Sequence, residues 1–478
     1  MRYALLIISI AIYSGQLFGQ IFNDKNQSIV VSDTLVNDTV TIEKIYILGN
    51  KKTKDHIILR ELRFSDGDRV SLGNLNEFIE RDRNRIYNTR LFNKVTIDIL
   101  ENGNDFVQIL IRVEERWYTF PLPIFELADR NFNDWWTNQN RDFSRVEYGI
   151  RFYQYNMRGR NERLRVTAQF GFTKLFDVEY TFPYINKGRK NGLSVFFQYL
   201  ENKNISYQTV DHKLVFLDSE ETLRELIRAS VKFTHRETFY NYHNLSLEFE
   251  ATRINDTIPQ LNPNYLADSA TSQRVFVLEY HFRRDYRDLI AYPLNGYLFD
   301  IKGTKRGLGI FDDLNQTILY SRFVKFINLK NGFYFSNRTA GQISFPKNPP
   351  YNKFQAFGYN QEFVRGFELN VIDGQNYILN KATLKKQLFK TEKNLGKAMP
   401  LEQFRTIPIA VYLNTYFDIG QVDVNFLYPD NSRLSNKFIY GGGLGLDIVT
   451  YYDAVLRLEY SINSEQETGF FIHFKADI

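Results

Sequence analysis

Apolar and polar residues alternate one by one along most of residues 117–478. In the stretch 245–252, every odd position is apolar or small and every even position is polar, and the stretch 227–234 and the last ten residues follow a similar pattern. Successive side chains of a β-strand point to opposite faces. The pattern therefore predicts strands with one apolar, aromatic face and one face that carries charges of both signs.

Two architectures fit such strands: a soluble sandwich buries the apolar face in a core, and a membrane barrel turns it to lipid. The barrel is favoured because the stretches are long for a sandwich and because no helical period interrupts them. Aromatic residues also make up 16% of the chain, as the interfacial girdles of a membrane barrel require. We therefore expect an all-β transmembrane barrel of antiparallel strands over residues 117–478.

The number of alternating stretches is odd, whereas a closed barrel of this type needs an even number. The weakest stretch is 206–217, and assigning it to an extracellular hairpin leaves about sixteen barrel strands. Short periplasmic turns are expected at residues 157–161, 182–192, 236–241 and 292–296, and long outer loops near 255–272 and 348–376.

The first residues have the form of a secretory signal peptide. A positive start at Arg2 precedes the apolar run 4–13, and the small residue Gly19 precedes the expected cleavage. An uncleaved anchor is the alternative, but the run is too short to span a membrane as a helix. We expect a signal peptide over residues 1–19 and a polar, flexible leader over residues 20–40.

Residues 41–115 carry a mixed pattern that predicts a compact α+β domain with the order β-α-α-β-β. Thr53 is expected to cap the first helix. The expected elements are a strand at 41–48, helices at 54–62 and 72–87, and strands at 94–100 and 106–113 around a turn at 102–104.

Composition excludes several kinds of chemistry. The chain has 60 Lys and Arg residues against 55 Asp and Glu residues, a balance too mild to indicate nucleic acid as a partner. The absence of cysteine excludes disulfides, thiolate metal sites and cysteine nucleophiles. The 6 histidines show no HExxH spacing, and no GxSxG motif occurs. We expect no enzyme activity, no catalytic residue, no metal and no cofactor.

The α+β segment contains Gly49-Asn50, Gly67-Asp68, residues 60–62 and above all the stretch NTRLFNKV at residues 88–95. In these features it resembles a POTRA domain, the polypeptide-transport-associated module of the periplasm. Strands that flank such a domain can leave an open edge, with which an incoming extended segment can pair.

A second resemblance lies in the stretch FVRGF at residues 363–367, followed by Asp373-Gly374. It is similar to the VRGF loop of the BamA-type outer-membrane family, and residues 416–422, 441–447 and 456–460 resemble later strands of that family. The resemblance implies a POTRA domain joined to a sixteen-stranded outer-membrane barrel that inserts or translocates other polypeptides. Implied partners are membrane lipids, unfolded β-barrel or secreted client polypeptides, and periplasmic accessory lipoproteins. A single POTRA domain, where the main assembly protein of the family has several, leaves a specialised or accessory role open. The family usually ends its barrel in an aromatic residue, and Ile478 departs from this signal for insertion of the barrel itself.

The loop motif consists of Val364, Arg365, Gly366 and Phe367. A loop that folds back into the lumen must pair any guanidinium that it buries. Arg365 is the candidate, and the strand register places Asp418 and Glu459 on the inward face, where both can serve as its carboxylate partners. Gly366 allows close backbone approach and Phe367 packs on the wall. The alternative is that Arg365 is a solvated loop arginine.

The first and last strands must close the barrel, and a weak seam between them exposes edge groups with which a client strand can pair. The last strand is therefore expected to form one side of a lateral gate. A passive channel and a dedicated two-partner exporter are the alternatives. The gate residues are Gly469, Phe470, Phe474 and Ile478.

Overall fold

The computed structural model describes nine ranges of the chain: 39–101, 105–127, 132–137, 140–311, 313–346, 349–359, 362–424, 431–450 and 454–474. The expected signal peptide, most of the expected leader, the turn at 102–104 and Ile478 lie outside the described residues.

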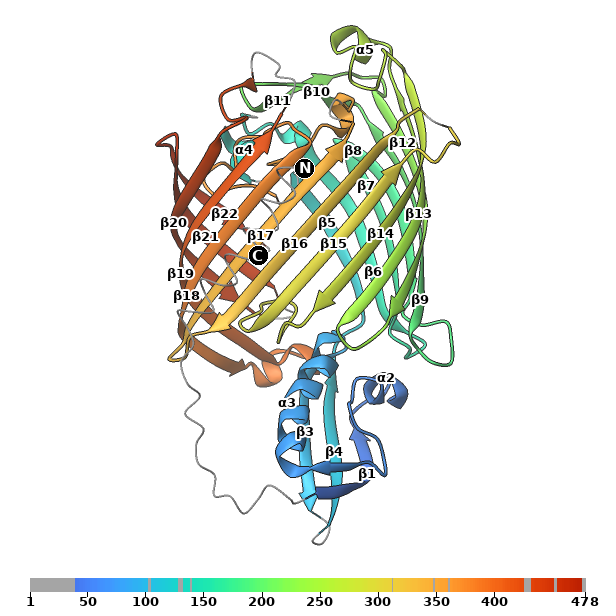
Figure 1. The fold of residues 1–478 in the computed structure, drawn as a ribbon, viewed down its shortest axis with the longest axis vertical. Helices are drawn as coiled ribbons and strands as arrows, with labels where there is room; N and C mark the ends of the chain where they lie inside the picture. Colours follow the sequence, from blue (N-terminus) through green and yellow to red (C-terminus); the bar gives the residue numbers. More distant parts are fainter. Residues whose placement is uncertain are drawn as a thin grey trace.

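The N-terminal part of the described chain is a small mixed sheet covered by helices α2 (Asp55–Leu59) and α3 (Leu72–Asn88) (Figure 1). The sheet order is β2-β1-β4-β3, in which β1 and β4 are parallel. Buried residues of the helices, among them Ile57, Leu75 and Ile86, share one core with Ile42 and Ile109 of the sheet. The α+β prediction is confirmed. The strands are β1 (Thr39–Leu48), β2 (Arg69–Ser71), β3 (Phe92–Glu101) and β4 (Phe106–Glu115).

Three details of this part differ from the prediction. The strand β2 was not predicted, because three residues are too few to show an alternation. The strand β1 begins at Thr39, inside the expected leader. Thr53 does not cap α2, because the helix starts later and Lys54 is its N-cap. The buried hydroxyl of Thr53 instead donates to Glu115 Oε1 at 2.6 Å.

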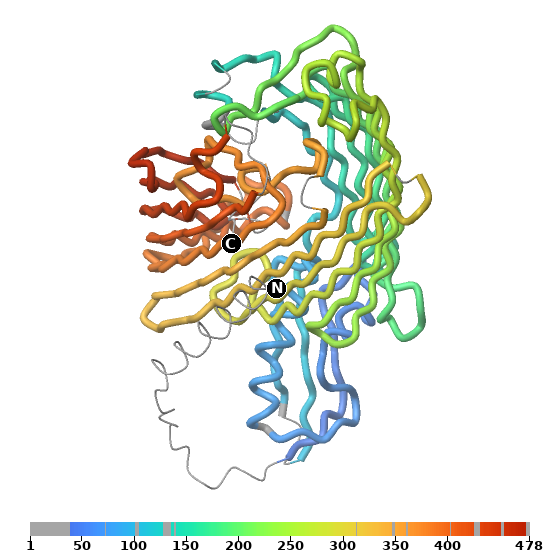
Figure 2. Tube along the Cα trace, turned by 45° about the horizontal axis from the view of Figure 1, so that its top comes forward, coloured from blue at the N-terminus to red at the C-terminus, as the bar shows by residue number. Residues whose placement is uncertain are grey.

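The rest of the chain forms a 16-stranded antiparallel sheet that curls into a barrel (Figures 1 and 2). This confirms the predicted fold class. Its strands are β5 (Thr119–Leu127), β6 (Val146–Met157), β7 (Glu162–Gly171), β8 (Thr173–Phe182), β9 (Asn191–Asn202), β12 (Arg224–Arg236), β13 (Asn241–Ile254), β14 (Ser272–Asp285), β15 (Gly296–Arg306), β16 (Gln316–Asn328), β17 (Phe333–Phe345), β18 (Asn376–Asn394), β19 (Thr406–Asp423), β20 (Phe438–Val449), β21 (Val455–Asn463) and β22 (Thr468–His473).

The weakest alternating stretch lies outside the barrel wall, as predicted. The strands β10 (Asn204–Val210) and β11 (Lys213–Asp218) form a separate 2-stranded sheet, and β9 pairs directly with β12. Figure 1 shows this hairpin at the end of the barrel opposite the N-terminal domain. Long connections meet at the hairpin end, and the turns that join β6 to β7, β8 to β9 and β12 to β13 lie where short turns were predicted.

The two faces of the barrel wall have opposite character. Leu247 pairs with Val231 across β13 and β12 and is 47% exposed on the outside, whereas Glu250 is 4% exposed on the inside. The polar side chains of the inner face are held in ion pairs such as Arg228 with Glu250 and Arg322 with Asp300. An apolar outer band with a polar interior is the arrangement that a bilayer requires of a barrel.

Short helices occur in the connections, among them α4 (Phe132–Thr137) and α5 (Thr257–Leu261). Across the described ranges, none of the helices combines the length and the apolar character needed to cross a membrane.

The N-terminal domain contacts the turns at its end of the barrel. The Glu61 carboxylate accepts two hydrogen bonds from the Arg236 guanidinium, each of 2.6 Å. The Asn156 amide donates to Thr53 Oγ1 at 2.8 Å, and Asn88 donates to the carbonyl of Asp288 at 2.9 Å. These contacts come from the segments on either side of α2 and from the end of α3, so the helical side of the domain lies against the barrel.

Candidate functional site

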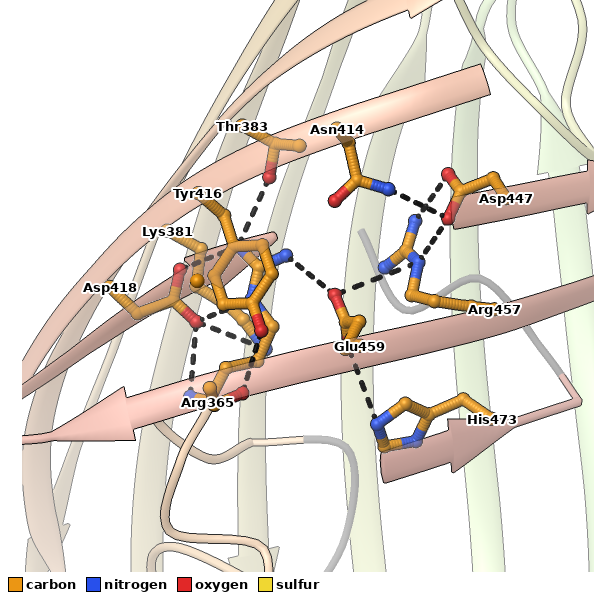
Figure 3. Close-up of polar contacts among 12 residues, drawn as sticks. Arg365, Lys381, Thr383, Asn414, Tyr416, Asp418, Asp447, Arg457, Glu459 and His473 are labelled. Carbon is orange, nitrogen blue, oxygen red and sulfur yellow. Dashed lines mark hydrogen bonds and ion pairs between the residues drawn. The ribbon is translucent and has the colours of Figure 1, made fainter. Parts of the chain in front are cut away.

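Apolar residues of the connection between β17 and β18 pack against strands of the barrel wall. Val364 and Phe367 are buried in a cluster with residues of β18, β19 and β20, including Leu379, Val422 and Ile439. This burial fixes the path of the connection, so that the polar residue between the two anchors, Arg365, points into the interior of the wall (Figure 3).

Arg365 is paired on every side of its guanidinium. Its Nε lies 2.8 Å from Asp418 Oδ2 and its Nη2 lies 2.6 Å from Asp418 Oδ1, so the contact is bidentate. Its Nη1 donates to Glu459 Oε1 at 3.2 Å and its Nη2 also donates to Thr383 Oγ1 at 3.0 Å. The guanidinium lies 3.9 Å from the centre of the Tyr416 ring. Such complete pairing offsets the desolvation of a buried cation.

A second buried ion pair continues this network along β20 and β21. Arg457 contacts Asp447 through Nε at 2.7 Å and Nη2 at 3.0 Å (Figure 3). Arg457 Nε also lies 3.9 Å from Glu459, which joins the two groups. Tyr292, from the connection before β15, donates to Asp447 at 2.7 Å. The network therefore links four neighbouring strands, β18 to β21, with a loop from each end of the barrel.

Alternate glycines of β20 make room for the Arg365 segment. A Cβ on Gly441 would lie 2.0 Å from the carbonyl oxygen of Arg365, and one on Gly443 would lie 2.7 Å from the Tyr416 hydroxyl. Gly366 has a φ of +96°, a conformation that favours glycine, and its carbonyl accepts from Asn463 at 2.8 Å. Sequence reasoning predicted the close approach at Gly366 but missed the role of the β20 glycines, although glycines at alternate positions of a strand signal close approach of another backbone.

The residues expected at the seam lie at the free end of the sheet. Gly469 and Phe470 belong to β22, with Phe470 exposed on the outside. Phe474 follows the strand, and Ile478 lies outside the described residues. In the described part of the chain, β22 pairs with β21 and β5 pairs with β6, and no pairing joins β5 to β22.

The two ends of the sheet nevertheless approach each other. The helix α4, which follows β5 in the chain, lies beside β22. Because the sheet curls round (Figure 2), the unpaired edges of β5 and β22 belong to one seam.

Two family profiles match the chain. The profile described as the Omp85 superfamily domain matches residues 156–475, and the POTRA profile, described as a surface antigen variable number repeat, matches residues 40–116. The chain belongs to the Omp85 superfamily. The resemblance to BamA-type proteins is thereby confirmed, and this Omp85 barrel lies in the outer membrane with its POTRA region in the periplasm.

Individual relatives agree with this family. The outer membrane protein assembly factor BamA of Nitratidesulfovibrio vulgaris is 32% identical over 78 residues, which cover 16% of this chain and 9% of that protein. The structure of BamA from Haemophilus ducreyi lacking POTRA domains 1–3 has a TM-score of 0.50 at 15% identity, with 91% of this chain and 83% of that chain covered. CdiB from Escherichia coli has a TM-score of 0.55 at 10% identity, with 91% and 75% covered. At these identities, the two structures establish a shared fold.

Proposed function

We propose that this Omp85 protein inserts or translocates other polypeptides at the outer membrane, with the seam between β5 and β22 as a lateral gate. The observation that carries the proposal is the pair of edges that face this seam without hydrogen-bonding to each other in the described residues. Unpaired strand edges are templates for another strand. In a membrane, a client strand that pairs with such an edge satisfies its backbone groups before it meets lipid.

The last strand is suited to open. Within the described residues, which end at 474, β22 pairs with β21 over the 6 residues Thr468–His473, whereas β19 has 18 residues. Fewer backbone hydrogen bonds must break when such a strand separates or exchanges partners. A gate at this edge therefore disturbs the barrel less than an opening between two long strands.

The N-terminal domain supplies a second open edge. Within the described residues, β3 pairs with β4 alone, so its other edge is available to an extended client. In this proposal, residues 41–115 act as a periplasmic POTRA domain that receives clients, and residues 117–478 act as the membrane barrel. Unfolded barrel proteins or secreted polypeptides are the proposed clients, and accessory lipoproteins are proposed partners.

Depletion of the protein followed by proteomics of the outer membrane tests this function. Broad loss of barrel proteins supports insertion, and loss of one secreted protein or a small group supports dedicated export. No change in either fraction, together with a stable conductance in planar bilayers, contradicts the proposal and favours a passive channel.

A further inference from the structure

Two carboxylates and one imidazole converge on the inner side of the last strand (Figure 3 shows Glu459 and His473). His473 Nε2 lies 3.4 Å from Glu459 Oε2 and 3.9 Å from Glu368 Oε1, and one ligand atom of each residue lies within 4.8 Å of the others. Ligands of a tetrahedral Zn²⁺ ion lie about 2 Å from the metal and hence about 3.3 Å from each other. A small inward movement of these three side chains brings them to that spacing.

Each carboxylate is held by its other oxygen. Glu368 Oε2 accepts from the backbone N–H of Gly366 at 2.7 Å, and Glu459 Oε1 accepts from Arg365 Nη1 at 3.2 Å. The other oxygens, Glu368 Oε1 and Glu459 Oε2, are the ones that approach His473. Metal ligands are commonly oriented by such outer contacts.

The two guanidinium groups beside the cluster have their bidentate partners outside it, Arg365 in Asp418 and Arg457 in Asp447. Each also lies near Glu459, at 3.2 Å and 3.9 Å. Glu368 and Glu459 are both buried and lie close together. Two neighbouring carboxylates repel each other unless a proton or a cation lies between them.

We propose that Glu368, Glu459 and His473 bind a divalent transition-metal ion, with Zn²⁺ as the best match to two carboxylates and one imidazole. Three protein ligands leave one position for water, as in open zinc sites. The sequence indicated no metal, because the ligands come from a loop and two strands and form no local motif. The ion would join β22 to β21 and to the Arg365 loop. The site itself does not depend on the proposed function, but an effect of the ion on a gate at β22 does.

Metal binding is measured on the full chain, purified in detergent and freed of metal by a chelator. Titration calorimetry with Zn²⁺ and the visible absorption of added Co²⁺ are the two readouts. We expect about one ion per chain, with absorption typical of a low-coordinate nitrogen and oxygen site. Zn²⁺ should also raise the unfolding temperature of the protein, because it binds the folded chain preferentially.

Glu368→Gln and His473→Gln remove one ligand each, and we expect each to weaken Zn²⁺ binding more than about a hundredfold. The control is His281→Gln, which removes another inner imidazole, one that pairs with Asp300. Glu459 is left intact because it also holds Arg365. Heat-modifiable migration in gels verifies that each variant is folded.

Failure of the wild-type chain to bind Zn²⁺ or Co²⁺ would overturn the proposal. Equal binding by the wild type, Glu368→Gln and His473→Gln would overturn it as well. Neither result bears on transport, which the depletion experiment tests separately.

Discussion

The guanidinium of Arg365 and the carboxylate of Asp418 form a bidentate ion pair at 2.8 and 2.6 Å, in which both side chains are buried, at 2% and 0% exposure. The pair joins the connection after β17 to the middle of β19. The backbone N–H of Arg365 also donates to Asp418, at 3.1 Å, so one carboxylate holds both the side chain and the main chain of the loop.

Arg365→Ala should release the loop and destabilise the barrel. The change leaves Asp418 and Glu459 without the charge that they face, and loss of one partner of a buried pair costs about 3–5 kcal/mol. Heat-modifiable migration and the unfolding temperature measure the effect. The control is Arg253→Ala, since Arg253 is 78% exposed and 3.9 Å from Glu225, and such a pair contributes about 0–1 kcal/mol. Equal stability of the two variants would show that Arg365 is not an anchor.

Gly441→Ala should displace the same loop from the opposite side. The new Cβ would lie 2.0 Å from the carbonyl oxygen of Arg365, a backbone atom that moves only with the loop. We expect a loss of about 1–3 kcal/mol, as for other overpacked sites. Gly303→Ala in β15 is the matched control, because its Cβ meets nothing within 4 Å. A Gly441→Ala protein as stable as the control would contradict the packing described for β20.

The alternating pattern predicts the barrel well because side-chain direction in a strand is a local property. It places Asp418 and Glu459 on the inward face, where the structure brings both to Arg365. The contacts of Glu368 and the glycines of β20 depend instead on the path of a long connection, which no local pattern specifies. The cap at Thr53 failed for a different reason, since a shift of one residue in the start of a helix changes its capping residue.

The contact between Glu61 and Arg236 should make the attachment of the POTRA domain sensitive to acid. Burial acts to raise the pKa of Glu61, but the charge and hydrogen bonds of Arg236, together with the charges of Arg60 and Arg85, outweigh burial, and the pKa lies below its ordinary value. A carboxylate with a lowered pKa stabilises the folded state above its ordinary pKa of 4.5, and this contribution is lost as the pH falls through the lowered value.

A double-mutant cycle with Glu61→Gln and Arg236→Gln measures this contact. We expect a coupling energy of about 1–3 kcal/mol in the denaturant-induced unfolding of the POTRA domain. The coupling should shrink at strongly acidic pH. Additive effects of the two changes at neutral pH would mean that the contact does not hold the domain.

His212 should make the outer hairpin sensitive to mild acid. Its Nε2 accepts from the backbone N–H of Leu434 at 3.0 Å, and its Nδ1 lies 3.2 Å from the carbonyl of Val371, so the imidazole must be neutral with the proton on Nδ1. Burial and then the charge of Arg433 lower the pKa of His212 to about 4. The nearby Asp211 opposes this shift and Lys437 adds to it.

A histidine with a lowered pKa stabilises the folded state fully above its ordinary pKa of 6.5, and the contribution falls between pH 6.5 and about 4. The protection factors of the Leu434 and Val371 amides, which correct for the intrinsic change of exchange with pH, should therefore fall as the pH is lowered over this range. His212→Gln should remove the extra dependence. Protection that stays constant down to pH 4 would contradict a neutral, buried imidazole.

Disulfide trapping at the seam tests the lateral gate most directly. The chain has 0 cysteines, so a single cysteine pair can be introduced, with one cysteine in β5 and the other in β22. The variant is expressed in a strain depleted of the native protein. The control pair replaces Val231 and Leu247, which face each other across the continuous strands β12 and β13. We predict that an oxidised seam pair reproduces the outer-membrane losses of depletion, that a reductant reverses them, and that the control pair has no effect. An oxidised seam variant that maintains the outer-membrane proteins as well as the native protein does would contradict the account.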